Sequence, residues 1–144
     1  MNNIVLNTST GAVSEYDWRF QSISPTHAGD AVGLYELGGD TDLGQPIAAR
    51  ITTARLQWGA SLKKCIVAVY LSMTGVGQGR LTVHGHAGSW SYAFPILAAG
   101  VSRSVPGKGI RENYLAFSVE NLGGGAFALD SIEALDAPSK TRRI

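Results

Sequence analysis

Short apolar runs recur along this chain, and glycine- or proline-containing turns separate them. The aromatic residues Trp90, Tyr92 and Phe94 occupy alternate positions, which is the two-residue period of a strand. The continuously apolar run Cys65 to Met73 is short for a helix and typical of a central strand buried on both faces. Turn signals recur roughly every ten residues, as in β-sandwiches. The pattern predicts an all-β fold, a single antiparallel β-sandwich of jelly-roll or immunoglobulin-like type.

The chain has the length of one ordinary domain, 144 residues. A β-prone run at Asn3 to Asn7 precedes the turn-forming Thr8 to Gly11, which predicts an N-terminal hairpin. We expect residues 1–33 to form this hairpin or arm, packed on a neighbouring chain, residues 34–137 to form the sandwich, and residues 138–144 to be a basic C-terminal tail.

The segment Leu34 to Gly59 joins an extended run to the longest strand-like run of the chain through a glycine- and aspartate-rich loop. Gly38 to Gly44 predicts a tight or bulged turn, and Ile47 to Trp58 predicts a long strand. Asp40 and Asp42 are weak candidates for calcium ligands because alternate carboxylates in such a loop can face one cation. The favoured interpretation is that they bond their own turn backbone, with no metal or cofactor.

Composition excludes several classes of protein. The net charge of +1 lacks the basic footprint of a nucleic-acid-binding domain. Cys65 is the only cysteine, so no intrachain disulfide forms, and a buried inert thiol is expected. No run of about 18 apolar residues predicts a membrane span, and no signal-peptide pattern is present. We expect neither nucleic-acid binding nor membrane insertion.

No catalytic set is apparent, and we expect the protein not to be an enzyme. No serine lies in a GxSxG motif, and no base adjoins Cys65. Gly75, Gly77 and Gly79 predict a hairpin turn that leads into a strand at Arg80 to His86. In that strand Leu81 and Val83 would point inward, and His84 and His86 would share the opposite face, where two imidazoles can share zinc. Since two ligands do not make a zinc site, the sequence favours ordinary exposed strand histidines.

Subunit contact is the favoured role for the aromatic residues and the basic tail. Tyr16, Trp18 and Phe20 alternate with charged residues, which predicts one strand with an aromatic face. Interfaces favour Trp, Tyr and Arg. A terminal isoleucine after two arginines could anchor on a partner. The residues expected at interfaces are Tyr16, Trp18, Phe20, Trp58, Trp90, Arg142, Arg143 and Ile144.

A resemblance is carried by three segments: LYELGGDTDLGQPIAARITTARLQWG, PGKGIRENYLAFSVEN and FALDSIEALDAPSKTRRI. Together they resemble an uncharacterised group of small structural proteins from the tails of bacteriophages and prophages. The resemblance implies a virion component at the tail tip, baseplate or fibre base, present in several copies as a homo-oligomer such as a trimer or hexamer. Other tail proteins would be its partners, and the host cytoplasm its location during assembly.

Two alternatives stay open. A carbohydrate- or receptor-binding module would stack Trp18, Trp58 or Trp90 on the sugar rings of a host-surface glycan, beside a calcium ion at Asp40 and Asp42. A small hydrolase with an unrecognised site ranks below both other interpretations.

Overall fold

The computed structural model of the protein consists of β-strands and the loops that join them. The structure describes residues 3–9, 11, 13–16, 19–39, 41–57, 59, 62–107 and 109–138. Within these residues every regular element is a strand, every pairing is antiparallel and no helix occurs. The chain divides into two compact units, Met1–Gly39 and Asp40–Ile144. The prediction of an all-β fold is therefore confirmed.

The first unit contains two small sheets. β1 (Asn3–Leu6) and β2 (Val13–Tyr16) form the expected hairpin. β3 (Ser22–Ile23), β4 (His27–Gly29) and β5 (Leu34–Glu36) follow as a three-stranded sheet in that order. The sequence instead predicted one strand running through Tyr16, Trp18 and Phe20, but β2 ends at Tyr16 and Phe20 lies outside any strand.

The first unit ends later than expected. Pro25, Gly29, Asp30 and Gly33 interrupt any strand period in residues 24–33, which is typical of a connection. The structure nevertheless has β4 within these residues, paired with β5. The turn between these strands is closed by Asp30, whose Oδ1 accepts the backbone N–H groups of Val32 and Gly33 at 2.7 and 2.9 Å. Because β5 belongs to this sheet, the division falls after Gly39 instead of Gly33.

Few side chains of the first unit are buried. Among its described residues only Ala28 and Gly29 are fully buried. Ile4, Leu6 and Val13 share one face of the hairpin, since Leu6 lies two residues from Ile4 and directly opposite Val13. The large apolar side chains that stay exposed are Ile4 (72%), Leu6 (58%), Val13 (65%), Ile23 (46%), Val32 (87%) and Leu34 (73%). The described part of this unit therefore has no apolar core of its own.

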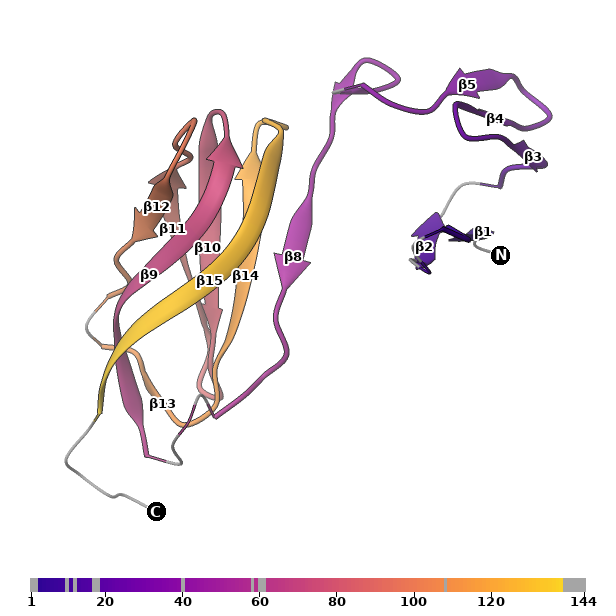
Figure 1. The fold of residues 1–144 in the computed structure, drawn as a ribbon. Helices are drawn as coiled ribbons and strands as arrows, with labels where there is room; N and C mark the ends of the chain where they lie inside the picture. Colours follow the sequence, from indigo (N-terminus) through magenta and orange to yellow (C-terminus); the bar gives the residue numbers. More distant parts are fainter. Residues whose placement is uncertain are drawn as a thin grey trace. The chain divides into compact units, whose positions relative to one another are not determined.

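The second unit contains two larger sheets (Figure 1). The first sheet has the order β11-β10-β14-β8, and the second is built on β9, with β15 along one edge and β12 and β13 in succession along the other. The strands of the first sheet are β8 (Arg50–Thr52), β10 (Gln78–His84), β11 (Ser89–Pro95) and β14 (Ala116–Leu122). Those of the second are β9 (Lys64–Gly75), β12 (Val101–Ser104), β13 (Arg111–Glu112) and β15 (Phe127–Pro138).

The two sheets share one hydrophobic core. In Figure 1, β9 and β15 cross in front of β10 and β14. Alternation along each strand sends every second side chain inward, and Leu71, Leu81 and Phe117 are wholly buried. The core cluster consists of Ile66, Val69, Leu71, Met73, Leu81, Val83, Phe94, Ile96, Ile110, Leu115, Phe117 and Val119.

β9 is the central strand that its apolar run predicts, but only one of its faces is well buried. Val67 is 43% exposed, and Cys65 is half-buried instead of enclosed. A register irregularity between Leu135 and Asp136 leaves Val67 without a partner residue in the β9–β15 ladder.

The glycine-rich turn after β9 does not make a hairpin. The sequence predicted that Gly75, Gly77 and Gly79 join two paired strands, whereas β9 belongs to the second sheet and β10 to the first. Gly75 permits a close approach there, since a Cβ on it would lie 2.5 Å from the carbonyl oxygen of Ala126. The turn therefore carries the chain from one sheet to the other.

The long strand predicted over Ile47 to Trp58 is wrong in its length. Among its described residues, 47–57, only Arg50–Thr52 forms a regular strand, and one isolated bridge joins Leu56 to Leu115. The ladder breaks at Thr53, because its Oγ1 takes the backbone N–H of Phe117 at 3.0 Å in place of a main-chain acceptor.

The loop before β8 is a two-residue hairpin between β6 (Thr41–Asp42) and β7 (Gln45–Pro46). Its turn residues are Leu43 (φ 48°) and Gly44 (φ 79°), and positive φ at both positions suits such a hairpin. The predicted tight turn is present, and Asp42 lies in β6 beside it.

Candidate functional site

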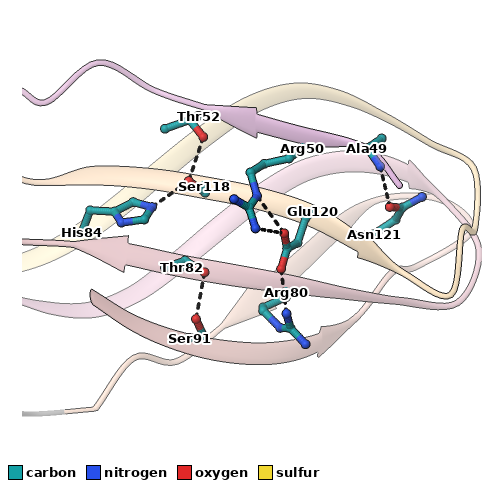
Figure 2. A network of polar contacts seen from close by, with 10 residues as sticks. All are labelled: Ala49, Arg50, Thr52, Arg80, Thr82, His84, Ser91, Ser118, Glu120 and Asn121. Carbon is teal, nitrogen blue, oxygen red and sulfur yellow. Dashed lines mark hydrogen bonds and ion pairs between the residues drawn. The ribbon is translucent and has the colours of Figure 1, made fainter. Parts of the chain in front are cut away.

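The first sheet turns a polar face away from the core (Figure 2). Leu81 and Val83 of β10 point inward, so the residues between and beside them lie on the opposite face. The strand registers align these residues in rows across the sheet. We define the polar face as Arg50, Thr52, Arg80, Thr82, His84, Ser91, Ser118 and Glu120.

Glu120 is held between two arginines on this face. Nε and Nη2 of Arg50 donate to its Oε2 at 2.8 and 2.5 Å, and Nη1 of Arg80 donates to Oε1 at 2.9 Å. The hydrogen bond from Arg50 is the largest of the effects that lower the pKa of Glu120, while burial opposes them. Since the arginine side chains are 64% and 45% exposed, each ion pair contributes about 1 kcal/mol or less to stability.

His84 bridges hydroxyl groups on two neighbouring strands. Its Nε2 lies 2.7 Å from Oγ of Ser118 and its Nδ1 lies 2.8 Å from Oγ of Ser89. A serine nucleophile activated by histidine needs a group that orients the imidazole, commonly a carboxylate. Here the hydroxyl group of Ser89 occupies the position of that orienting group. Ser118 is itself buried, and its Oγ lies 2.8 Å from Oγ1 of Thr52. The arrangement ties β8, β14, β10 and β11 together and lacks the features of a catalytic pair.

A pocket of about 310 Å³ opens elsewhere in the second unit. Four chain segments supply its lining: the stretch after β8, the stretch before β9, the turn between β10 and β11, and the stretch from β13 to β14. The lining residues are Arg55, Lys63, His86, Glu112, Asn113 and Tyr114. Its volume lies at the lower end of the range of small-molecule sites.

Glu112 is the one carboxylate among the described residues of this lining, and it is 7% exposed. Its Oε1 accepts the backbone N–H of Ala87 at 3.0 Å. Gly85 makes room for it, because a Cβ on Gly85 would lie 2.5 Å from Cγ of Glu112. The turn after β10 thus supports the carboxylate by one hydrogen bond and one close contact.

Hydrogen bonds to neighbouring residues also hold the side chains of Arg55 and Tyr114 in the pocket lining. Nη2 of Arg55 donates to the carbonyl oxygen of Gly85 at 3.3 Å. Nε2 of Gln57 donates to the hydroxyl oxygen of Tyr114 at 2.7 Å, and Nζ of Lys64 donates to the carbonyl of Gln57. The hydroxyl hydrogen of Tyr114 therefore remains able to donate to a ligand.

The structure describes only some of the residues that the sequence placed at sites or interfaces. Trp90 is half-buried and packs against the core, and Phe20 is half-buried in the first unit. Tyr16 is described as the last residue of β2. The residues that lie outside the described part are Trp18, Asp40, Trp58, Arg142, Arg143 and Ile144.

The predicted metal candidates within the described residues are Asp42, His84 and His86, whereas Asp40 lies outside them. Asp42 pairs with Gln45 in the small hairpin. β10 ends at His84, so His86 lies in the following turn and not on the same strand face as expected. Within the part of the chain that the structure describes, no three His, Cys, Asp or Glu side chains form a metal-binding group.

The pocket was missed in the sequence because its members are far apart and individually ordinary. Glu112 belongs to RENY and His86 to HGHAG, and neither segment matches a known binding motif. One available signal was Gly85 beside two histidines, since an isolated glycine at a strand end often marks a close approach.

Comparison with known proteins yields no match: no family model fits the chain, and no curated protein or solved structure is significantly similar to it. No helix long and apolar enough to cross a membrane occurs among the described residues.

Proposed function

We propose that this chain is a non-enzymatic structural protein of a tailed-bacteriophage virion, part of the tail tip, baseplate or fibre attachment. Its second unit would be an antiparallel β-sandwich, since two open sheets share one core. Its first unit would be an arm that binds neighbouring copies or other tail proteins. The resemblance of the sequence to tail proteins motivates the virion assignment, and the exposed apolar residues of the first unit motivate the arm.

The single observation that carries the proposal is the apolar strip of Ile4, Leu6 and Val13 on the β1–β2 hairpin. Burying one such side chain fully contributes about 1.5–3 kcal/mol. A strip of three therefore provides on the order of 6 kcal/mol, which falls within the 4–15 kcal/mol that association costs. One arm alone would bind weakly, so several contacts per subunit are needed, as in a closed ring.

The assembly proposal is tested by measuring the mass of the full chain with light scattering, alone and with the products of neighbouring genes. We expect a discrete homo-oligomer, such as a trimer or hexamer, or a discrete complex with a partner. The double variant Leu6→Ser/Val13→Ser should dissociate it. The matched variant Val76→Ser/Val105→Ser removes two equally exposed valines of the second unit and should leave the mass unchanged.

A monomer under all these conditions, or equal dissociation by both variants, would overturn the proposal that the first unit is a binding arm. The virion assignment is tested separately by mass spectrometry of purified particles from the bacterium that carries the gene. Particles that lack this chain would overturn that assignment.

A further inference from the structure

We propose that the pocket lined by Arg55, Lys63 and Glu112 binds an acidic sugar, a pyranose ring that carries one carboxylate. This inference is independent of the arm and of the virion assignment. It uses none of the tryptophans that the sequence suggested as sugar platforms.

Arg55 and Lys63 in the pocket lining select for a negatively charged group on the ligand. Arg55 and Lys63 are both exposed, and no ion pair with either occurs among the described residues, where both ion pairs belong to Glu120. Arg55 donates to the carbonyl oxygen of Gly85 through Nη2, and a guanidinium group has five N–H donors in all. A ligand carboxylate could take hydrogen bonds from both cations, and such charge-assisted bonds are about twice as strong as neutral ones.

Glu112 adds a requirement for a hydrogen-bond donor on the ligand. Glu112 is almost wholly buried and accepts the N–H of Ala87, which leaves further acceptor capacity on its carboxylate. A sugar hydroxyl can donate there. An inorganic anion would be repelled by the carboxylate of Glu112. A neutral sugar would leave Arg55 and Lys63 without a counter-charge.

Tyr114 supplies the third feature of a sugar site. Its side chain is half-exposed at the pocket, where an aromatic face can cover the apolar C–H face of a pyranose. Its hydroxyl accepts from Gln57 and can donate to a ring hydroxyl. One carboxylate, several hydroxyls and an apolar face together describe a uronic acid or a related acidic sugar.

The proposal is tested by NMR titration of the full chain with D-glucuronate, and with D-glucose, inorganic phosphate and L-alanine as competing chemistries. An oligosaccharide that ends in glucuronate distinguishes a free sugar from the end of a glycan. We expect saturable shifts at the backbone amides of Ala87 and Asn113 with glucuronate. Glucose, phosphate and alanine should bind at least about tenfold more weakly, since each lacks one of the matched groups.

Three variants examine the contacts. Arg55→Gln and Lys63→Gln should each weaken glucuronate binding about tenfold, and Tyr114→Phe should weaken it less. Arg103→Gln is the matched control, because Arg103 lies over the ring of Tyr70 in the second sheet and not in the pocket. The proposal is overturned if glucuronate does not saturate, if phosphate or alanine binds equally well, or if Arg103→Gln has the same effect as Arg55→Gln.

Discussion

The ring of Phe94 in β11 packs over Gly79, its direct partner in β10. A Cβ on Gly79 would lie 2.5 Å from Cζ of that ring, and Phe94 is itself buried in the core. We predict that Gly79→Ala lowers the free energy of unfolding by about 1–3 kcal/mol, the usual cost of overpacking. Urea denaturation measures the change. Gly109→Ala is the control, because no described atom comes within 4 Å of its added Cβ, and an equal loss in both variants would contradict the prediction.

The pKa of Glu120 makes part of the stability depend on pH. Because the folded-state pKa lies below the ordinary value, the stabilisation is present above the unfolded pKa, about 4.3, and is lost as pH falls through the folded pKa. Glu120→Gln should therefore cost up to about 1 kcal/mol at pH 7 and progressively less in acid. Urea denaturation of both proteins from pH 7 to pH 3 measures this difference.

The matched control for Glu120 is Glu133→Gln, since Glu133 is exposed on β15 and no ion pair involves it among the described residues. Its effect should be small at every pH. A stability difference for Glu120→Gln that stays constant down to pH 3 would show that the ion pairs with Arg50 and Arg80 are not its cause.

Leu43 adopts a positive φ of 48° in the β6–β7 turn, a conformation that costs most L-residues about 1–2 kcal/mol. Asparagine tolerates this region better. We predict that Leu43→Asn raises the free energy of unfolding by up to about 1 kcal/mol, whereas Leu43→Ala, which keeps the strain and removes the exposed side chain, gives no gain. Thermal denaturation distinguishes the two, and an equal gain in both variants would point to the lost leucine instead.

The contact between Gly85 and Glu112 connects the turn after β10 to the pocket. Gly85→Ala should displace the Glu112 side chain, destabilise the fold by about 1–3 kcal/mol and weaken glucuronate binding. Gly88→Ala in the same turn is the control, since its Cβ would meet only a Trp90 ring atom at an ordinary 3.8 Å. Stability and NMR titration are measured for both, and retained binding in Gly85→Ala would contradict the role of this contact.

The elements that local pattern determines were predicted well. The hairpin of β1 and β2, the central position of β9 and the inward direction of Leu81 and Val83 all follow from a two-residue period and turn residues close in sequence. Such signals are local, so the printed sequence contains them completely.

The pairing of distant strands was not predictable in the same way. The glycines between β9 and β10 suit a hairpin and a crossing between sheets equally well, and only the partners of each strand decide between them. The break in the ladder at Thr53 depends on its hydroxyl meeting Phe117, which no neighbouring residue reveals.

The candidate site was harder to predict than the strand pairing, because it depends on tertiary contacts alone. Glu112 becomes a buried acceptor only because Gly85 and Ala87 approach it from another strand end. The conspicuous residues of the sequence, the tryptophans and aspartates, attract attention because of their chemistry, whereas the pocket uses residues that are common on any surface.

The pairing of β15 with β9 also has a consequence for biosynthesis. β15 is the last strand of the described chain, yet it covers β9 from Gly75 to Lys64. During synthesis, the edge of β9 that pairs with β15 therefore stays unpaired until the residues of β15 have left the ribosome. Pairings of such large sequence separation form slowly and leave nascent chains open to aggregation, so we expect expression at low temperature or with added chaperones to raise the soluble yield.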